Sequence, residues 1–367
     1  MNVVCYERDF SKHRLYFRAN CKDKGDWYVS FFICLLVWSC YPSRRVDKVC
    51  FVADNTTDSV TWEPFLPESG TLNVFYNICV DDSFLYCLDF HNDSILKVYS
   101  LASTPSVVGY AMQGQGPDDL IFPLFTCEIV QVDESIKMVD VNAWRMKEIK
   151  TVPTVWGRVS LRGTALPIVP MMEDYAETDS CIYGTDIDAK NEAFFMYDKV
   201  ERKVTSAGFN EEVNELIQGY SEESVPFLLS GHLLLHPEAG LCRTMKNSNS
   251  LFFYNLQGEL LKEIVIGKER KWPKGDGKEC LDFSDEEKYT LSVTGSEKVL
   301  CVLYHGYLLR ASGQCSKILM FDWDGNLVRI VQTDRDVSRI AISPDGKYLY
   351  GLAETEEGGT DVVRLNI

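Results

Sequence analysis

The segment Lys317-Ile-Leu-Met-Phe-Asp-Trp-Asp-Gly-Asn-Leu-Val-Arg-Ile-Val-Gln332 carries the pattern that decides the fold. An apolar run leads into a short acidic turn that ends at Gly325, and a second β-rich run follows. Gly325 stands where a hairpin turn needs a positive φ, which glycine adopts without steric cost. The segment is therefore expected to form two antiparallel strands joined by a tight turn.

The same pattern recurs along the chain, and its recurrence predicts the architecture. Two clear copies are Leu251-Phe-Phe-Tyr-Asn-Leu-Gln-Gly258 and Phe194-Phe-Met-Tyr-Asp198, and fainter copies lie at 95–100, 137–140 and 362–365. Strands and turns alternate at intervals of about 10 residues, as in an antiparallel meander. Six such registers, about 40 to 70 residues apart, indicate an all-β fold, a six-bladed β-propeller of four-stranded antiparallel blades.

Residues 41–367 are expected to form this propeller as one closed domain. No Pro/Ser-rich linker or sharp change of composition divides them, and the best helical segments, 211–219 and 285–289, are short enough to decorate loops. Closure of the ring removes exposed sheet edges. We therefore expect the strand near 49–52 to pair beside the C-terminal strand of the last blade.

Residues 1–40 read as a signal segment that is removed on export. Trp27 to Trp38 form an uncharged apolar block, shorter than the roughly 20 residues that a spanning helix needs. Leu36-Val-Trp-Ser-Cys40 resembles the bacterial lipobox, in which the cysteine is acylated and becomes the new N-terminus. Lipidation is therefore expected at Cys40.

The long, mixed-charge stretch before the apolar block suggests that translation starts downstream of Met1. The alternatives are a short membrane helix and a buried N-terminal element of the fold.

Net charge excludes one class of partner, and the spacing of the cysteines argues against a metal site. The formal charge is −17, with 54 acidic and 37 basic residues, and no basic stripe with interleaved aromatics offsets it. Such a surface repels phosphate backbones, so nucleic acid is excluded as a partner. The 13 cysteines show no metal-ligand spacing. Those inside apolar runs, Cys79, Cys87 and Cys301, are expected to be small buried hydrophobic residues, with one or two disulfides open among the rest.

One loop resembles a known family. Gly114-Gln-Gly-Pro-Asp-Asp-Leu120 is similar to the Gly-x-Gly-Pro-Gly-Glu-Phe signature of TolB-like and NHL-like six-bladed propeller lipoproteins of Bacteroides-type bacteria. The segment 321–326 and the turn Ser343-Pro-Asp-Gly-Lys347 resemble the last blades of that family. The resemblance implies a propeller fold and an envelope location, and it assigns no activity.

Four residues are candidates for ligand binding. His305 ends a predicted strand where the mouth of a propeller channel would be. Trp272 lies in the basic, glycine-rich stretch 267–278, where it could stack on a sugar or a peptide. Asp118 and Asp119 belong to the loop that carries the family resemblance. For each, a purely structural role is the alternative.

Other chemistry-bearing residues are expected to be structural. His232 and His236 share a face of a predicted strand but lie about 13 Å apart, too far for a common metal. Asp322 and Asp324 precede a glycine as in a calcium loop, but the downstream acidic ligand is missing. No motif for a serine hydrolase, a nucleotide-binding loop or a zinc protease occurs. No catalytic residue, metal or cofactor is predicted.

These observations lead to two functional hypotheses. The first is a lipid-anchored propeller of the bacterial cell envelope, facing the periplasm or on the outer membrane, that binds a protein or glycan ligand without catalysis. The alternative is a propeller enzyme, a lyase or a metal-assisted hydrolase, with its site at the central channel. A cluster of His305 with carboxylates around an ion at the centre would favour the enzyme.

Overall fold

The computed structural model describes residues 7–9, 14–16, 47–51, 58–66, 73–102, 104–130, 135–167, 172–186, 190–273, 287–307 and 315–367. The chain divides into two units, Met1–Arg45 and Val46–Ile367. In the first, β1 (Glu7–Asp9) and β2 (Arg14–Tyr16) pair as antiparallel strands. Cys40 and the apolar block 27–38 lie outside the described residues. Among the residues that are described, no helix is long and apolar enough to cross a membrane.

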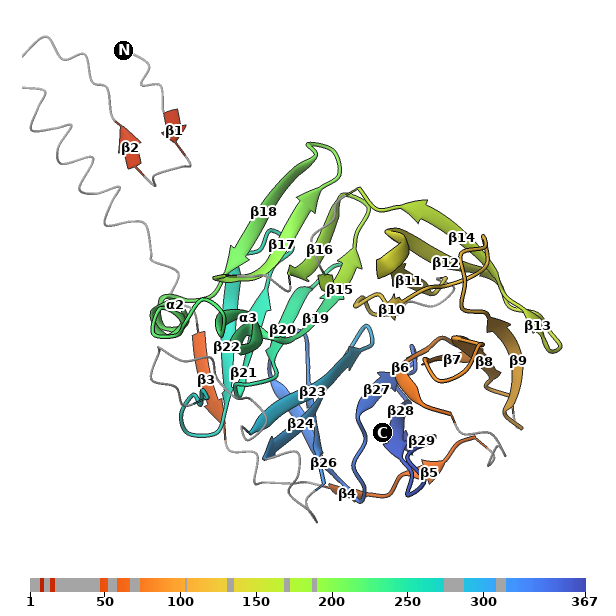
Figure 1. Ribbon diagram of the computed structural model, residues 1–367. Coiled ribbons are helices and arrows are strands. Elements are labelled where there is room, and N and C mark those ends of the chain that lie inside the picture. Colours follow the sequence, from red (N-terminus) through yellow and green to blue (C-terminus); the bar gives the residue numbers. More distant parts are fainter. Residues whose placement is uncertain are drawn as a thin grey trace, which may run out of the picture. The chain divides into compact units, whose positions relative to one another are not determined.

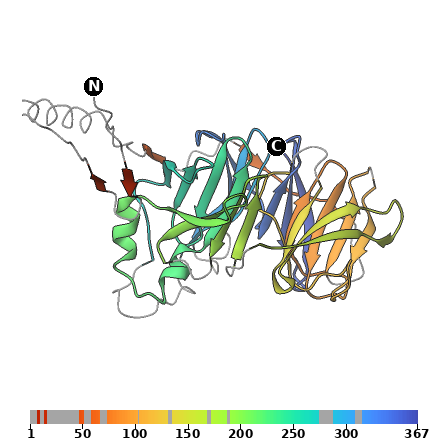
Figure 2. The ribbon, with the colours of Figure 1, turned by 90° about the horizontal axis from the view of Figure 1, so that it is seen from above.

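The second unit is a six-bladed β-propeller, which confirms the predicted fold class. Figure 1 shows six small sheets in a ring, and Figure 2 shows the same sheets after a turn of 90°. Each sheet is called a blade here, and its first strand is the inner one. In the first five blades the four main strands follow one another as antiparallel neighbours and form a local meander, whereas blade VI takes its fourth strand from residues 63–64.

The first three blades occupy the chain from residue 75 to residue 208. Blade I consists of β6 (Phe75–Val80), β7 (Phe84–Asp89), β8 (Leu96–Ser100) and β9 (Ser106–Ala111), with β13 (Gly157–Arg158) parallel to β9. Blade II consists of β10 (Pro123–Phe125), β11 (Lys137–Asp140), β12 (Arg145–Thr151) and β14 (Ser160–Ala165), with the short helix η1 (Val141–Ala143) between β11 and β12. Blade III consists of β15 (Met172–Glu177), β16 (Cys181–Asp186), β17 (Glu192–Asp198) and β18 (Lys203–Gly208).

The last three blades follow two short helices, α2 (Glu211–Ile217) and α3 (Val225–Leu229). Blade IV consists of β19 (Gly231–His236), β20 (Gly240–Met245), β21 (Ser250–Tyr254) and β22 (Leu260–Ile266). Blade V consists of β23 (Lys288–Gly295), β24 (Leu300–Tyr307), β25 (Lys317–Phe321) and β26 (Leu327–Thr333). Blade VI consists of β27 (Arg339–Ile342), β28 (Tyr348–Glu354), β29 (Thr360–Asn366) and β5 (Glu63–Pro64).

The repeated motif forms the outer hairpin of two blades, as its glycines predict. The segment 317–332 forms β25 and β26, and the copy at 251–266 forms β21 and β22. Gly325 and Gly258 have φ values of 72° and 78°, in the left-handed region that favours glycine. The predicted helix at 211–219 is present as α2, with Asn210 as its N-cap.

The ring is closed by a different strand from the one expected. The prediction that residues 49–52 pair with the C-terminal strand is wrong, because β3 (Asp47–Phe51) adds to blade IV, parallel to β22. The next segment, β4 (Asp58–Val60), adds to blade V in the same way. Only then does β5 pair antiparallel with the C-terminal strand β29. The segment 47–64, called the belt below, therefore contributes a strand to three successive blades.

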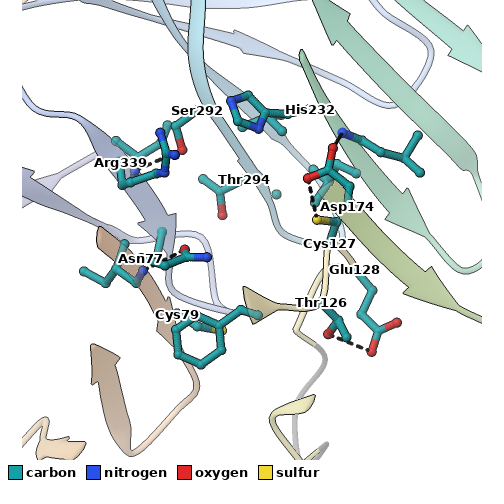
Figure 3. Close-up of a pocket in the computed structure, with 18 of the residues that line it drawn as sticks. Asn77, Cys79, Thr126, Cys127, Glu128, Asp174, His232, Ser292, Thr294 and Arg339 are labelled. Atoms are coloured by element: carbon teal, nitrogen blue, oxygen red, sulfur yellow. Dashed lines mark hydrogen bonds between the residues drawn. The ribbon is translucent and has the colours of Figure 1, made fainter. Parts of the chain in front are cut away.

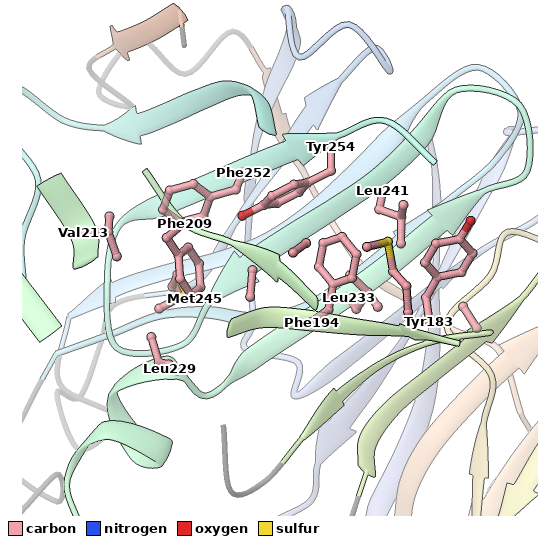
Figure 4. Close-up of a cluster of buried hydrophobic side chains, with 14 of the residues drawn as sticks. Tyr183, Phe194, Phe209, Val213, Leu229, Leu233, Leu241, Met245, Phe252 and Tyr254 are labelled. Carbon is pink, nitrogen blue, oxygen red and sulfur yellow. The ribbon is translucent and has the colours of Figure 1, made fainter. Parts of the chain in front are cut away.

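Apolar residues of neighbouring blades pack face to face and form the core. The cluster between blades III and IV, which α2 and α3 cover, is drawn in Figure 4 and includes Phe194, Leu233 and Phe252, each at most 1% exposed. Free cysteines in this part of the structure are Cys79, Cys87, Cys127, Cys181, Cys242, Cys301 and Cys315. Cys87 and Cys301 are fully buried, as predicted, whereas Cys79 is half-buried.

Candidate functional site

The inner strands of all six blades line one central cavity of about 310 Å³. Figure 3 shows the polar side chains around it. The residues whose side chains matter below are Asn77 from β6, Cys127 after β10, Asp174 from β15, His232 from β19, Ser292 and Thr294 from β23, and Arg339 from β27. A cavity of this size lies at the lower end of the range typical of small-molecule sites.

Side chains in this wall satisfy backbone groups of the adjacent blade. Ser292 Oγ accepts a hydrogen bond from Ile340 N at 3.2 Å, and Thr294 Oγ1 accepts one from Ile342 N at 3.2 Å. Such N–H groups lie at the edge of an inner strand, where no further strand can satisfy them. The polar residues of the wall therefore join blade to blade and hold the cavity in shape.

Arg339 brings a positive charge to the cavity without a carboxylate partner among the described residues. Its Nη1 donates to the carbonyl oxygens of Leu291, at 2.9 Å, and Ser338, at 3.1 Å. Burial lowers the pKa of the guanidinium group, and Asp174 acts in the opposite direction. An arginine remains charged under these conditions, since its ordinary pKa lies far above neutral pH. Its other nitrogens keep N–H groups that no described residue accepts.

His232 stands in the same wall and is held neutral mainly by its burial. Its Nε2 lies 3.0 Å from the carbonyl oxygen of Leu291, so Nε2 carries the proton, and the ring is neutral when Nδ1 is not protonated. Burial, together with the positive charges of Arg339, Arg243 and Lys246, lowers the pKa of His232 to about 3. The imidazole is therefore neutral at physiological pH, and its surroundings are electropositive in a protein whose total charge is negative.

Asp174 stands in the same wall, and its hydrogen-bonding capacity is used. It accepts hydrogen bonds from Leu233 N at 2.9 Å, from Cys127 Sγ at 3.2 Å and from Thr185 Oγ1 at 3.4 Å. Burial raises the pKa of Asp174, and the charge of Arg243 offsets part of that effect. This carboxylate links blades II, III and IV.

The segment Cys127 to Ile129, called the strap, separates the central cavity from a second cavity beside blade III. Cys127 N donates to Tyr175 O at 2.6 Å, Leu235 N donates to Cys127 O at 2.7 Å, and Ile129 N donates to Leu235 O at 3.0 Å. The strap thus ties blade II to blades III and IV. Its Glu128 lines the central cavity and also the second cavity, which has a volume of about 760 Å³.

The charged groups of the second cavity are largely paired with each other. Lys137 Nζ lies 3.5 Å from Glu128 Oε1 and 3.3 Å from Glu177 Oε1, and Lys199 Nζ lies 2.9 Å from Glu177 Oε2. These opposite charges neutralise one another within the protein. The central cavity, with its unpaired arginine, is the stronger candidate for a ligand site.

The structure places His305 away from this site. It lies on β24, the second strand of blade V, and its side chain is 6% exposed. Its Nδ1 is 2.9 Å from Ser316 Oγ, which in turn donates to Asp336 Oδ1 at 3.0 Å. Ser316 is fully buried, so this chain of polar groups fixes the interior of blade V and offers no accessible nucleophile. The cluster around His305 that would have favoured an enzyme does not lie at the centre.

Asp118 and Asp119 hold their own loop in place. Asp118 Oδ1 accepts from Leu161 N at 2.8 Å, and Asp119 pairs with Arg158 and accepts from Gly116 N at 2.8 Å. A Cβ atom at Gly114 or Gly116 would come within 2.6 Å of the Asp119 carboxylate. The carboxylate of Asp119 therefore packs closely against both glycines, which gives the motif a structural reason.

Trp272 and Arg270, from the same basic stretch, also turn inward. The indole is half-buried and packs against the core cluster of blades III and IV. Arg270 is almost fully buried and forms a two-pronged ion pair with Glu263. Residues 274–278 lie outside the described residues. The binding roles predicted for Trp272, His305, Asp118 and Asp119 stay predictions, and the structure does not bring these residues together.

The residues expected to be structural have internal partners. His232 and His236 lie on one strand, as predicted, and His236 Nδ1 accepts from the backbone N–H groups of Glu238 and Ala239. Asp322 accepts from Asn326 N in the hairpin turn. Within the described parts of the chain, no group of three or more His, Cys, Asp or Glu residues could hold a metal ion.

Sequence reasoning missed the central site because its residues carry no local motif. Asp174, Ser292 and Arg339 come from three different blades and are 118 and 47 residues apart in succession. The available signal was polar residues within apolar strands, since inner strands of a propeller face its axis. Recognising it requires knowing which strand of each blade is innermost.

Comparisons with known proteins extend the fold assignment. No protein-family model matches the sequence, and no curated protein is similar to it. A solved structure from Bacteroides fragilis, a protein inferred to be exported, is 12% identical, covers 87% of this chain and 98% of its own, and has a TM-score of 0.52. The extracellular domain of an inferred one-component system from B. thetaiotaomicron is 11% identical, covers 85% of this chain and 42% of its own, and has a TM-score of 0.45. At these identities the similarity to the first structure shows a common fold and nothing more.

Proposed function

We propose that the protein is an exported, lipid-anchored propeller that binds a small envelope-derived ligand in its central cavity and does not transform it. The observation that carries the proposal is the convergence of six inner strands on one polar cavity. The hydrogen bonds between blades hold the walls of that cavity before any ligand arrives. A preformed site binds with less ordering cost than a flexible one.

Two observations support the proposed location. Ser39-Cys40 follows an apolar block, in the arrangement of a bacterial lipobox. The structural neighbour from B. fragilis is itself inferred to be exported. Acylation at Cys40 would hold the propeller at a membrane surface, where envelope glycans or proteins, or fragments of them, are its available ligands.

Filling the cavity is expected to abolish ligand uptake. Thr294→Phe places a ring beside the cavity, whereas Thr294→Ser keeps the hydroxyl group that accepts from Ile342 N. Wild type and both variants are incubated with the small-molecule fraction of a bacterial envelope extract, and retained compounds are measured by native mass spectrometry. We expect wild type and Thr294→Ser to retain at least one compound that Thr294→Phe does not.

Folding of each variant is checked by far-UV circular dichroism and by its melting temperature. Retention of the same compounds by folded Thr294→Phe would contradict a ligand site in the central cavity. Retention of no compound by wild type would contradict the binding function itself.

Anchoring is tested by replacing the cysteine of the lipobox. The protein is expressed with its native N-terminus in a bacterium that processes lipoproteins, and its intact mass is measured after extraction from membranes. We expect residues 40–367 plus acyl groups for wild type, and a soluble or unprocessed product for Cys40→Ala. Cys50→Ala serves as the matched control, since it removes a cysteine ten residues downstream. A wild-type chain that begins at Met1 would refute the anchor.

A further inference from the structure

The groups that the cavity wall leaves available are mostly hydrogen-bond donors. The hydroxyl oxygens of Ser292 and Thr294 each accept a backbone N–H, which leaves the hydroxyl proton to be donated. Asn77 Oδ1 accepts from Ile78 N at 2.9 Å, which leaves the Nδ2 amide group. Arg339 donates hydrogen bonds to described residues only through Nη1, so Nε and Nη2 can donate to a ligand. All four side chains line the same cavity.

The acceptors of the wall, by contrast, are nearly all occupied. Asp174 accepts from a backbone N–H, a thiol and a hydroxyl group. His232 keeps an acceptor, because its Nδ1 is not protonated when Nε2 donates to Leu291 O. A ligand with several acceptor atoms and a hydroxyl group would therefore complement these side chains.

The charge of the wall indicates the sign of the ligand. Arg339 and Lys246 line the cavity, and neither has a carboxylate partner among the described residues. Burial is the main reason that the pKa of His232 is low, and the positive charges of Arg339, Arg243 and Lys246 lower it further. Asp174 acts on the guanidinium group of Arg339 through its charge, but no described carboxylate contacts it, so an anion that enters beside it would stabilise it.

We propose that the central cavity binds the carboxylate group of a small polyhydroxylated acid, such as a sugar acid, through Arg339. Nε and Nη2 of an arginine present two parallel N–H groups, which match the two oxygens of a carboxylate. Ser292, Thr294 and Asn77 donate to the remaining oxygens, and His232 Nδ1 accepts from a hydroxyl group. A phosphate dianion fits less well, because Asp174 places a carboxyl group in the same wall. This inference rests on the proposed function and names its ligand class.

The test compares glucose with two sugar acids and one sugar phosphate. D-glucuronate and D-gluconate carry a carboxylate, D-glucose is the neutral counterpart, and D-glucose 6-phosphate carries a phosphate. Binding of each to the full-length protein is measured by isothermal titration calorimetry. We expect the two acids to bind at least about tenfold more tightly than glucose and glucose 6-phosphate, in line with the strength of charge-assisted hydrogen bonds.

Two arginine variants separate the local effect from net charge. Arg339→Gln is expected to weaken glucuronate binding by roughly tenfold to a hundredfold. Arg339→Lys, which keeps the charge but not the planar fork, should retain only part of the affinity. Arg329→Gln removes the same charge from an exposed pair on the outer strand β26 and should bind as wild type does.

Four outcomes would overturn the inference, and the first three are results of the binding comparison. These three are equal binding of glucose and glucuronate, tighter binding of glucose 6-phosphate than of either acid, and unchanged glucuronate affinity in folded Arg339→Gln. Failure of both acids to bind would also overturn it, while retention of another compound by wild type but not by Thr294→Phe would leave the proposed function standing. If neither experiment shows a ligand, the proposed function fails as well.

Discussion

Replacing Trp62 with alanine is expected to lower the free energy of unfolding by about 3–5 kcal/mol, the usual cost of truncating a buried aromatic side chain. Trp62 lies in the belt between β4 and β5 and is 2% exposed. Its indole packs into the core cluster of blades V and VI, and its backbone N–H donates to Asp334 Oδ1 at 3.0 Å. The belt is therefore held to the ring by a core side chain as well as by strand pairing.

This prediction is measured by chemical denaturation, followed by far-UV circular dichroism because the substitution removes a fluorophore. Trp156→Ala is the matched control. Trp156 is 58% exposed, so its replacement should lower the free energy of unfolding by less than about 1 kcal/mol. Equal, small losses for both variants would show that the belt lies loosely against the blades. A large loss for Trp62→Ala alone would establish the belt as an integral part of the propeller.

The second large effect is expected at the buried ion pair of blade IV. Arg270→Met should lower the free energy of unfolding by about 3–5 kcal/mol, because it leaves the carboxylate of Glu263 buried without its counter-ion. Both side chains are almost fully buried, at 3% and 0% exposure, and Arg270 Nη2 lies 2.6 Å from Glu263 Oε1. Asn210 Nδ2 also donates to Glu263 Oε2 at 2.6 Å. The pair therefore joins the basic stretch, the turn before α2 and the outer strand β22.

A second substitution distinguishes the unpaired charge from lost packing. The double variant Glu263→Gln with Arg270→Met removes both charges and keeps an acceptor for Asn210, so it should recover most of the loss. Arg329→Gln, which breaks the exposed pair with Asp58, should change stability by less than about 1 kcal/mol. If the double variant were no more stable than Arg270→Met, the effect would lie in packing and not in the unpaired charge.

The inward orientation of Arg270 and Trp272 concerns the described part of the basic stretch, residues 267–273. Its composition suggested a solvated recognition loop in an acidic protein. In the structure, Arg270 neutralises Glu263 and Trp272 packs against a core cluster. Arg270 therefore serves internal pairing, a use that composition cannot distinguish from ligand recognition.

The sequence by itself determined the fold class, the number of blades and the hairpins around Gly258 and Gly325. These features are local, because a turn and its two flanking strands lie within about 20 residues and the alternating pattern fixes which face is buried. Burial of Cys87 and Cys301 followed from the same local pattern. The one error of topology, at β3, concerned a strand that pairs across more than 200 residues.

Only the tertiary structure decided which residues surround the axis. Arg339, Asp174 and His232 acquire a common cavity because the ring places the beginnings of three inner strands together. His305 lies inside blade V and not at the axis, because its strand β24 is the second strand of the blade. Distance from the axis depends on how six sheets close on one another, and no local pattern in the chain encodes that distance.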